Sequence, residues 1–318
     1  MFVRLSFMAQ SSVTRRQALA ALTASVGASI LPKSAQSAPA PLPFTLCLNM
    51  STIRGQKLGF VKELETAAKA GFRSVEIWID TLQDYLKQST TADARKRINE
   101  LGLTVENLIG FSPWIIDDET ARAKGLDQMK REMALLAELG CKRTAAPPVG
   151  AQTPVSPSID LRKAAERYRA ILEIGDQTGV VPQLELWGFS KNLNKLSEVM
   201  YVAIESGHPS ARLLLDIYHL YKGGTAPVSL PLVGKPAIDI FHVNDYPANL
   251  PRETITDPDR IFPGDGIAPI RETLAQIKTP GKSIVLSLEV FNKGYYAQPA
   301  QEVTNTAMTK MKAMIEGV

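Results

Sequence analysis

The stretch ARLLLDIYHLYKGG, residues 211–224, sets a run of leucines directly before an acid, Asp216. A histidine, His219, follows three residues later, and a Lys-Gly-Gly turn comes after it. Short apolar runs of this kind are typical of buried β-strands. Because this strand ends on a carboxylate, its carboxyl end is the place to look for chemistry.

Eight such stretches alternate with amphipathic helical segments along the chain. Strands are predicted at residues 44–50, 72–79, 103–111, 141–147, 180–187, 211–218, 237–245 and 283–291. Helices are predicted at 58–71, 91–102, 119–140, 160–179, 193–207, 267–278 and about 298–316. This alternation predicts an α/β fold, a single parallel (β/α)8 TIM barrel. An open doubly wound sheet alternates in the same way, but no Gly-rich dinucleotide turn follows the first strand.

The first 43 residues have the features of an export signal. Arg15 and Arg16 precede an apolar run at 18–31 and a small-residue region at 35–38. This order predicts a twin-arginine signal at 1–37, a linker at 38–43 and the barrel at 44–318. The apolar run of about 14 residues is shorter than the roughly 20 that span a bilayer. We expect a periplasmic protein with no membrane span in its mature form.

The predicted signal carries all of the basic excess. The full chain has 36 basic and 32 acidic residues, a net charge of +4. Cleavage would remove Arg4, Arg15, Arg16 and Lys33 and no acid, leaving 32 of each sign. A nucleic-acid-binding protein is expected to show a basic excess, so no nucleic-acid partner is predicted.

Ionisable side chains lie near the carboxyl ends of four consecutive predicted strands. Alternation along each strand points one residue from each toward the barrel axis, at the carboxyl ends where barrel active sites lie. These residues are Glu185, Asp216, His242 and Glu289. Three carboxylates would repel one another unless a cation lies among them. We therefore predict that the four hold one divalent ion, Mn²⁺ first, with Mg²⁺, Co²⁺ or Zn²⁺ as alternatives. Taken singly, each could be an ordinary ion-pair, capping or core residue.

A family resemblance rests on the same strand ends. The segments LELWG, LLLDIYH, IFHVND and LSLEVFN resemble motifs of the sugar phosphate isomerase/epimerase proteins, within the xylose isomerase-like TIM-barrel superfamily. The similarity covers nearly the whole chain after about residue 44, including STIRG and DRIFPGDGIAPI. That group includes ketose 3-epimerases, hydroxypyruvate isomerase, inosose dehydratase, a 3-dehydroshikimate dehydratase and, more distantly, endonuclease IV. The resemblance implies the same four metal ligands, Glu185 and Glu289 as catalytic acid and base, and a substrate contact from His219.

One position departs from the ketose 3-epimerase pattern. Those proteins have an arginine six residues after the metal-binding histidine, where this chain has Ala248. Arg252 and Arg260, in the loop at 246–266, are the expected substitutes. Further expected substrate-binding residues are Trp187, Glu76, Arg54 and Asp245. The PGDG segment at 263–266 is either an anion cradle before a helix or an ordinary turn.

These features predict a metal-dependent isomerase or epimerase that removes a proton beside a carbonyl through a metal-stabilised enediolate. The expected partner is a small sugar or polyol ketone, unphosphorylated because the protein is exported. The alternatives are a dehydratase (a lyase) of a keto-polyol or dehydroshikimate-like substrate and a non-catalytic carbohydrate-binding barrel that keeps the metal. Three histidines cannot build the three-zinc site of a repair nuclease. The sequence leaves open the exact substrate and whether the protein is a homo-oligomer.

Overall fold

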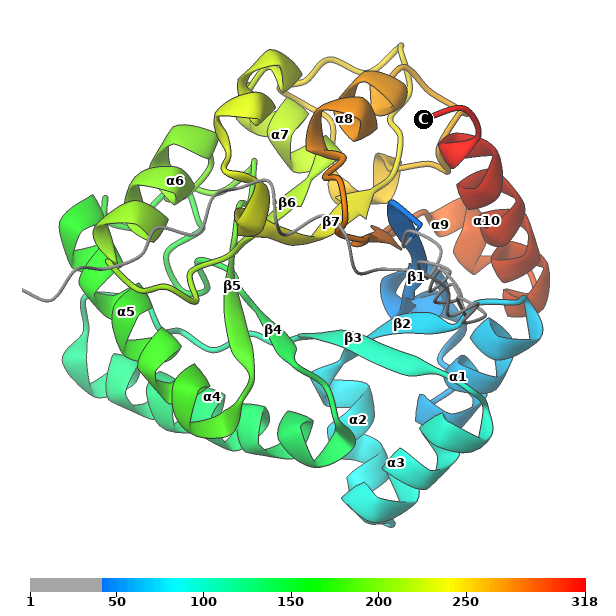
Figure 1. Cartoon of the computed structure of the whole chain (residues 1–318), viewed down its shortest axis with the longest axis horizontal. Helices are drawn as coiled ribbons and strands as arrows, with labels where there is room; N and C mark the ends of the chain where they lie inside the picture. Colours follow the sequence, from blue (N-terminus) through cyan, green and yellow to red (C-terminus); the bar gives the residue numbers. More distant parts are fainter. Residues whose placement is uncertain (1–41) are drawn as a thin grey trace, which may run out of the picture. The chain divides into compact units, whose positions relative to one another are not determined.

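The computed structural model describes residues 42–318, so the predicted export signal at 1–37 and most of the linker lie outside the described residues. Within residues 42–318, eight parallel strands pair in chain order, and the last pairs with the first to close a barrel. Figure 1 shows the strands as an inner ring with the helices outside it. The prediction of a single (β/α)8 barrel is confirmed.

All eight strands and the predicted helices are present, with boundaries a few residues inside the predicted ones. The strands are β1 (Phe44–Asn49), β2 (Ser74–Trp78), β3 (Thr104–Ile109), β4 (Arg143–Ala146), β5 (Val181–Glu185), β6 (Leu213–Asp216), β7 (Ile238–Val243) and β8 (Ile284–Leu288). The longer helices are α1 (Phe60–Lys69), α2 (Ile79–Leu86), α3 (Thr91–Glu100), α4 (Glu119–Leu139), α5 (Leu161–Thr178), α6 (Leu196–Glu205), α8 (Ile270–Ile277) and α10 (Ala300–Ile315). The shorter ones are η1 (Met50–Gln56), α7 (Ile217–Gly223), η2 (Pro227–Leu232), η3 (Lys235–Ala237), η4 (Asp257–Asp259) and α9 (Lys293–Tyr296).

Capping residues fix where the outer helices begin and end. Asp118 and Asp160 accept hydrogen bonds from backbone N–H groups in the first turns of α4 and α5, which satisfies donors that the helix itself leaves unpaired. Gly140 and Gly179 end the same two helices in the left-handed conformation, which glycine adopts without a Cβ penalty. These local signals place the helices between the strands as the sequence predicts.

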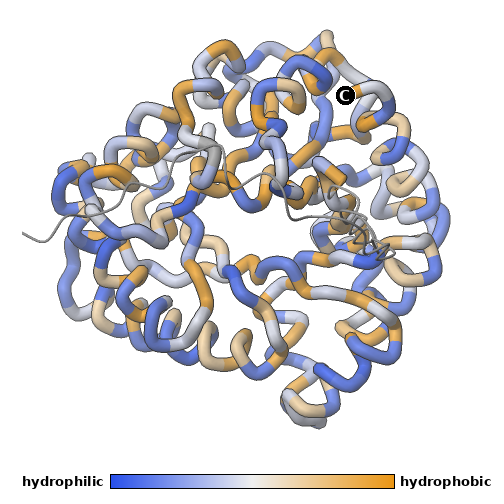
Figure 2. Tube along the Cα trace, viewed as in Figure 1, coloured by the Kyte–Doolittle hydropathy of each residue, from blue (hydrophilic) through white to orange (hydrophobic). Residues whose placement is uncertain are grey.

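Each outer helix buries one face against the barrel. On α1, for example, Phe60, Leu64 and Ala67 are buried, at the three- and four-residue spacing of one helix face. Figure 2 shows hydrophobic and hydrophilic residues mixed along these helices. Removing the apolar face from water is the main force that holds the helices on the sheet.

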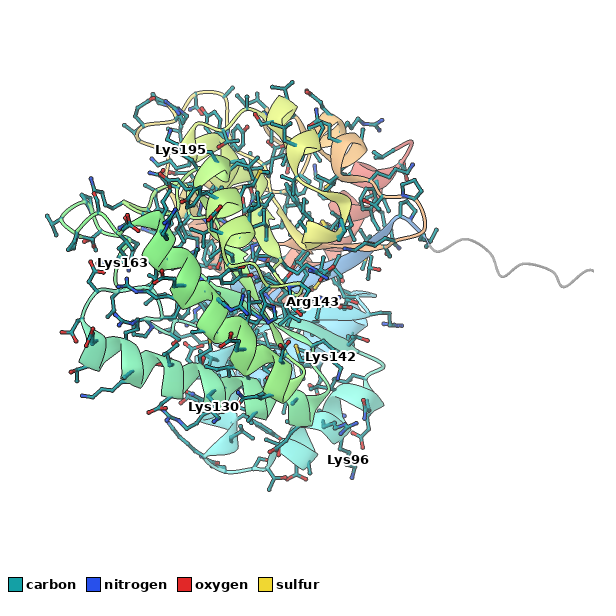
Figure 3. All side chains as sticks on the ribbon, turned by 60° about the vertical axis from the view of Figure 1, so that its left-hand side comes forward. Lys96, Lys130, Lys142, Arg143, Lys163 and Lys195 are labelled. Atoms are coloured by element: carbon teal, nitrogen blue, oxygen red, sulfur yellow. The ribbon has the colours of Figure 1, made fainter. Side chains whose placement is uncertain are left out.

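Positive charge is distributed over several elements. In Figure 3, Lys96, Lys130, Lys163 and Lys195 lie apart from one another, on α3, α4, α5 and the residue before α6. Arg143, at the start of β4, instead pairs with the carboxylate of Glu106 at 3.1 Å.

The helices of residues 42–318 include none that is both long enough and apolar enough to cross a bilayer. Within the described residues both cysteines, Cys47 and Cys141, are buried free thiols.

Candidate active site

Three ionisable side chains meet at the carboxyl ends of β6, β7 and β8. Asp216 ends β6, His242 lies near the end of β7, and Glu289 follows β8. One possible ligand atom from each lies within 4.8 Å of the others, and all three residues are buried. The strand register places Asp216 directly beside His242. The arrangement is therefore a candidate metal centre.

Glu185, the fourth predicted ligand, is buried at the end of β5 and lies outside this group of three. Its strand register pairs it with Leu214, two residues before Asp216, so it is not at the level that simple alternation implied. Its Oε2 is buried and has no hydrogen-bond partner among the described residues. Burial, partly offset by His242, raises the pKa of Glu185 to about 8. Glu185 is thus a buried carboxyl with one unpaired oxygen, close to the candidate metal centre.

In this structure the guanidinium of Arg260 lies among the carboxylates. Its Nη1 donates to Asp216 Oδ2 at 3.1 Å and to Glu289 Oε2 at 2.8 Å, and its Nη2 lies 3.0 Å from Nε2 of His219. The side chain is about 1% exposed, and its guanidinium carbon lies 4.4 Å from the centre of the Tyr218 ring. Burial lowers the pKa of Arg260, but the surrounding carboxylates outweigh burial and raise it. The guanidinium of Arg260 therefore places positive charge between the carboxylates of Asp216 and Glu289.

The structure favours Arg260 over Arg252 as the loop arginine of the site. Arg252 is exposed, pairs with its neighbour Glu253 at 3.1 Å and lines a different pocket beside Pro269. Ala248, the position of the epimerase arginine, is also exposed.

Glu76 lies beneath the candidate metal centre and does not line the cavity, contrary to its prediction as a substrate contact. It is fully buried, and its Oε2 lies 3.0 Å from Nε2 of His242. Asn107 donates to its other oxygen at 2.8 Å. Burial lowers the pKa of His242, but the charges of Glu76 and Glu289 outweigh burial and raise it well above its usual value. Glu76 therefore holds the Nε2 proton of His242 and leaves Nδ1, 3.3 Å from Glu289 Oε2, on the side of the carboxylates.

Asn49, the last residue of β1, links the neighbouring strands β2 and β8 through its side chain. Its Nδ2 donates to Glu76 at 3.0 Å and to Glu289 Oε1 at 3.1 Å. Its Oδ1 accepts from Nε1 of Trp78 at 2.9 Å. The sequence reading did not single out Asn49, although a polar residue at the end of an apolar strand was the available signal.

Asp216 has a second role that answers why its strand ends on an acid. Its Oδ1 accepts from the backbone N–H groups of Tyr218 at 2.6 Å and His219 at 3.1 Å, so the carboxylate caps α7. The strand was predicted to continue to residue 218, and that boundary is wrong because the chain turns into a helix at Ile217. Asn244 donates to Oδ2 at 3.0 Å. One carboxylate oxygen thus holds the helix while the other faces the site.

A cavity of about 170 Å³ opens above these residues. Aromatic side chains form most of its wall, and they are Trp78, Phe111, Trp187, Phe189 and Phe291. His219 also lines it, with a pKa that burial and then the charge of Arg260 lower well below the usual value. Since its Nε2 accepts from Arg260, the neutral imidazole carries its hydrogen on Nδ1, which has no partner among the described residues. His219 and Trp187, two of the expected substrate-binding residues, therefore both line this cavity.

Asp245 lies outside the cavity, and its carboxylate is already satisfied. It accepts hydrogen bonds from the backbone N–H groups of Tyr246, Gly264, Gly266 and Ala268 at 2.8–3.0 Å. The amides of the PGDG segment therefore bind a side chain of the protein's own chain. These bonds favour the ordinary turn for the PGDG segment, and Asp245 fixes this loop and does not line the cavity.

Arg54 lies at the edge of the site. Its guanidinium lies 4.2 Å from the ring centre of Trp78, a wall residue of the cavity. The side chain itself lines a larger neighbouring cleft, where it pairs with Asp80.

A closed parallel barrel with buried carboxylates, an imidazole and aromatic walls at its carboxyl end has the arrangement of a TIM-barrel enzyme. The chain belongs to the xylose isomerase-like TIM barrel family, which it matches over residues 64–314.

Related proteins include both isomerases and a dehydratase. The chain is 26% identical over 275 residues to the inosose isomerase of Bacillus velezensis, covering 85% of this chain and 96% of that protein. It is 25% identical over 250 residues to the 3-dehydroshikimate dehydratase of Pseudomonas putida, covering 76% of this chain and 37% of that protein. A crystal structure of the IolI protein with a bound zinc atom shares the fold, with a TM-score of 0.80 at 24% identity over 86% of this chain and 98% of that one.

Proposed function

We propose that this protein is a metal-dependent isomerase or epimerase of a sugar-like polyol ketone. The observation that carries the proposal is the convergence of buried Asp216, His242 and Glu289 on one point, beside Glu185, whose Oε2 has no hydrogen-bond partner among the described residues. The similarity to inosose isomerases over most of both chains supports a cyclic polyol ketone as the substrate class.

The donor set fits a divalent ion. Nδ1 of His242 is buried and lies 3.3 Å from Glu289 Oε2 and 3.9 Å from Asp216 Oδ2, and the neighbouring carboxylates raise the pKa of His242, so positive charge is favoured at the point that these residues surround. Asp216, His242, Glu289 and, after a side-chain movement, Glu185 would hold the ion. Mn²⁺ is our first choice for this oxygen-rich set, with Mg²⁺, Co²⁺ or Zn²⁺ as alternatives. A bound ion supplies positive charge that stabilises an oxygen beside the carbon being deprotonated.

The two glutamates are suited to opposite roles. Burial raises the pKa of Glu185, so in the metal-free protein it holds a proton at neutral pH. The charges of His242 and Arg260 overcome the effect of burial on Glu289 and lower its pKa, so it is ionised. Pairs of carboxyls whose environments separate their pKa values are typical of acid–base catalysis. Glu289 would take the proton from carbon, and Glu185 would return one.

The remaining groups would bind and orient the substrate. His219 would donate from Nδ1 to a substrate oxygen, and Arg260 would leave Asp216 to bind another. Trp187 and Trp78 would cover the apolar faces of the ring and exclude water. We also propose that the protein acts outside the cytoplasm on an unphosphorylated substrate, because of the twin-arginine pattern at residues 15–16.

A dehydratase is the second candidate, and the similarity to a 3-dehydroshikimate dehydratase favours it. Both reactions begin with the same proton removal and differ in what happens to the neighbouring hydroxyl. The test is to incubate the Mn²⁺-loaded protein in D₂O with inososes, ketoses and 3-keto sugars and to follow them by NMR. Deuterium beside the carbonyl with a rearranged product supports an isomerase, and loss of water supports a dehydratase. Binding without exchange in any substrate contradicts both.

The variant Glu289→Gln tests the assigned base. Its turnover should fall by about 10²–10⁴-fold, the usual contribution of a general base, while some metal is retained. Glu302→Gln, an exposed position on α10, is the matched control and should behave as wild type. Activity that survives in Glu289→Gln would show that another group removes the proton.

A further inference from the structure

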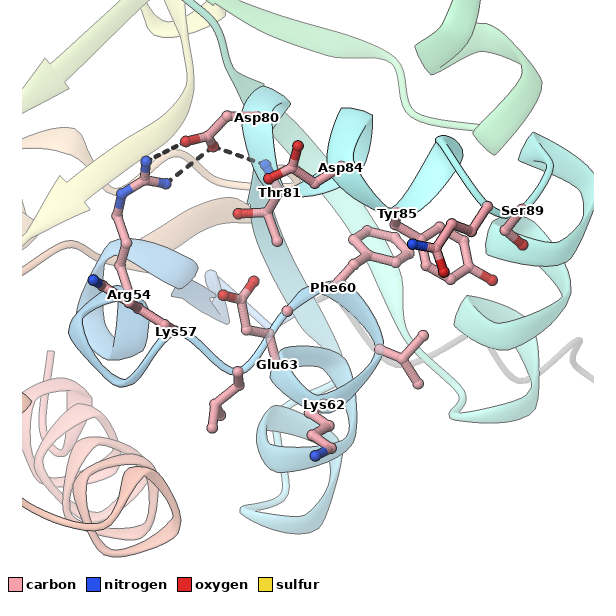
Figure 4. A pocket seen from close by; sticks show the side chains of 14 residues that line it. Arg54, Lys57, Phe60, Lys62, Glu63, Asp80, Thr81, Asp84, Tyr85 and Ser89 are labelled. Carbon is pink, nitrogen blue, oxygen red and sulfur yellow. Dashed lines mark hydrogen bonds and ion pairs between the residues drawn. The ribbon is translucent and has the colours of Figure 1, made fainter.

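A second, larger cleft lies beside the mouth of the barrel. It has a volume of about 840 Å³ and lies between η1, the start of α1, and α2 (Figure 4). This volume is within the range of about 300–1,000 Å³ that is typical of small-molecule sites. The stacked pair of Arg54 and Trp78 separates it from the 170 Å³ cavity, since Arg54 lines one and Trp78 lines the other.

The feature that points to a ligand is the side chain of Glu63. It is only 5% exposed, it lines the cleft, and no side-chain hydrogen bond to it occurs among the described residues. In Figure 4 its carboxylate points toward Arg54, Asp80 and Thr81. The carboxylate oxygens have no donor from the described residues and open into the cleft, where a ligand hydroxyl can donate to them.

The chemistry of the lining favours a neutral polyhydroxylated molecule. Three basic residues (Arg54, Lys57 and Lys62) and three acidic residues (Glu63, Asp80 and Asp84) line the cleft, so a charged ligand would be repelled by half of them. Hydroxyl groups both donate and accept hydrogen bonds, and they satisfy residues of either sign.

Aromatic and small residues complete the match. The ring of Tyr85 is partly exposed on the cleft wall and offers an apolar surface to the C–H face of a sugar ring, while the buried ring of Phe60 supports it with the ring centres 5.1 Å apart. Gly59, directly before Phe60, also lines the cleft, and a Cβ there would meet nothing within 4 Å. The cleft is therefore open at this point, and a ring has room to enter.

We propose that this cleft is a second carbohydrate-binding site, which takes a neutral sugar ring or short oligosaccharide and contacts it through Glu63, Asp80 and Tyr85. The site does not depend on the reaction at the mouth of the barrel, because it shares no lining residue with that cavity.

The test is to titrate the wild-type protein with cellobiose and to follow backbone amides by two-dimensional NMR. Saturable shifts are expected in residues 57–63 and 80–89. Glu63→Leu should weaken binding about tenfold, as expected for the loss of hydrogen bonds to a buried carboxyl. Glu63→Gln, which keeps donors and acceptors, should retain most of the affinity. Glu65→Leu is the matched control, because Glu65 lies on the same helix but pairs with Arg97 outside the cleft.

Three results would overturn the proposal. The first is the absence of saturable shifts in both segments, and the second is equal affinity in wild type and Glu63→Leu. The third is binding of glucosamine or glucuronate at these residues without binding of cellobiose, which would make the cleft a site for a charged ligand. Glu63→Leu is expected to fold, since it removes an unpaired buried acid.

Discussion

The contact between Glu76 and His242 leads to a sharp prediction about metal affinity. The two oxygens of Glu76 accept hydrogen bonds from four side chains, those of Asn49, Asn107, His242 and Ser287. In Glu76→Gln one oxygen becomes an NH₂ group, which faces donors and cannot accept from them. His242 then loses the partner that fixes its Nε2 proton and its ring orientation. Loss of such an outer partner usually weakens metal binding about 10–100-fold, or about 1.4–2.7 kcal/mol.

The assay is competition for Zn²⁺ or Co²⁺ against a chromophoric chelator, with thermal unfolding measured in parallel. Glu106→Gln is the matched control, because Glu106 is a largely buried barrel glutamate that pairs with Arg143 and does not touch His242. Both variants should lose stability, but only Glu76→Gln should lose metal affinity. An affinity of Glu76→Gln within about twofold of wild type, in a protein that still folds, would refute the positioning role.

Three further predictions follow from the site and its surroundings. Asp216→Ala should lose bound metal in elemental analysis and about 1–2 kcal/mol of stability, because the carboxylate also caps α7; unchanged metal content would remove Asp216 from the ligands. Burial raises the pKa of Glu63 from 4.5 to about 7, so its contribution to stability is present below about pH 4.5 and is lost as the pH rises through 7. In urea unfolding, the free energy of unfolding of Glu63→Leu relative to wild type should therefore rise by up to roughly 3 kcal/mol between about pH 4.5 and 8. A difference between the two proteins that does not change with pH would contradict this. Gly188→Ala should lower the free energy of unfolding by about 1–3 kcal/mol, because the new Cβ would lie 2.2 Å from the carbonyl oxygen of His219. Wild-type stability in thermal unfolding would mean that the backbone shifts there at little cost.

The barrel was predictable because its signals are local. Each strand is a short apolar run, and Asp118, Asp160, Gly140 and Gly179 mark helix ends by their own chemistry. The helix α7 was missed because its seven residues continue the apolar pattern of β6, and Asp216 fits a strand end and a helix cap equally well.

The candidate site was only partly predictable because its geometry depends on register and on distant contacts. Alternation placed Asp216, His242 and Glu289 on the inner face, but the offset between β5 and β6, which sets Glu185 apart, leaves no trace in the order of residues. The hydrogen bond between His242 and Glu76 joins residues 166 positions apart, and no local sequence pattern predicts it.

Contacts made by backbone groups, and the path of a long loop, are harder still to predict from sequence. The amides that hold Asp245 belong to residues 246–268, and backbone donors carry no side-chain signal. The choice between Arg252 and Arg260 depends on how one long loop folds over the barrel, which composition does not specify.

The contacts of Asn49 constrain the order in which parts of this protein can fold during synthesis. The strand β1, near residue 44, needs β8, near residue 284, as its neighbour, and Asn49 reaches Glu289 across that seam. A nascent chain still lacking its last 35 residues has neither the closing strand nor that carboxylate. Contacts between such distant parts of a chain form slowly. Ion capture should thus be a late event, and a chain truncated before β8 should emerge from the ribosome as an open sheet without a metal centre.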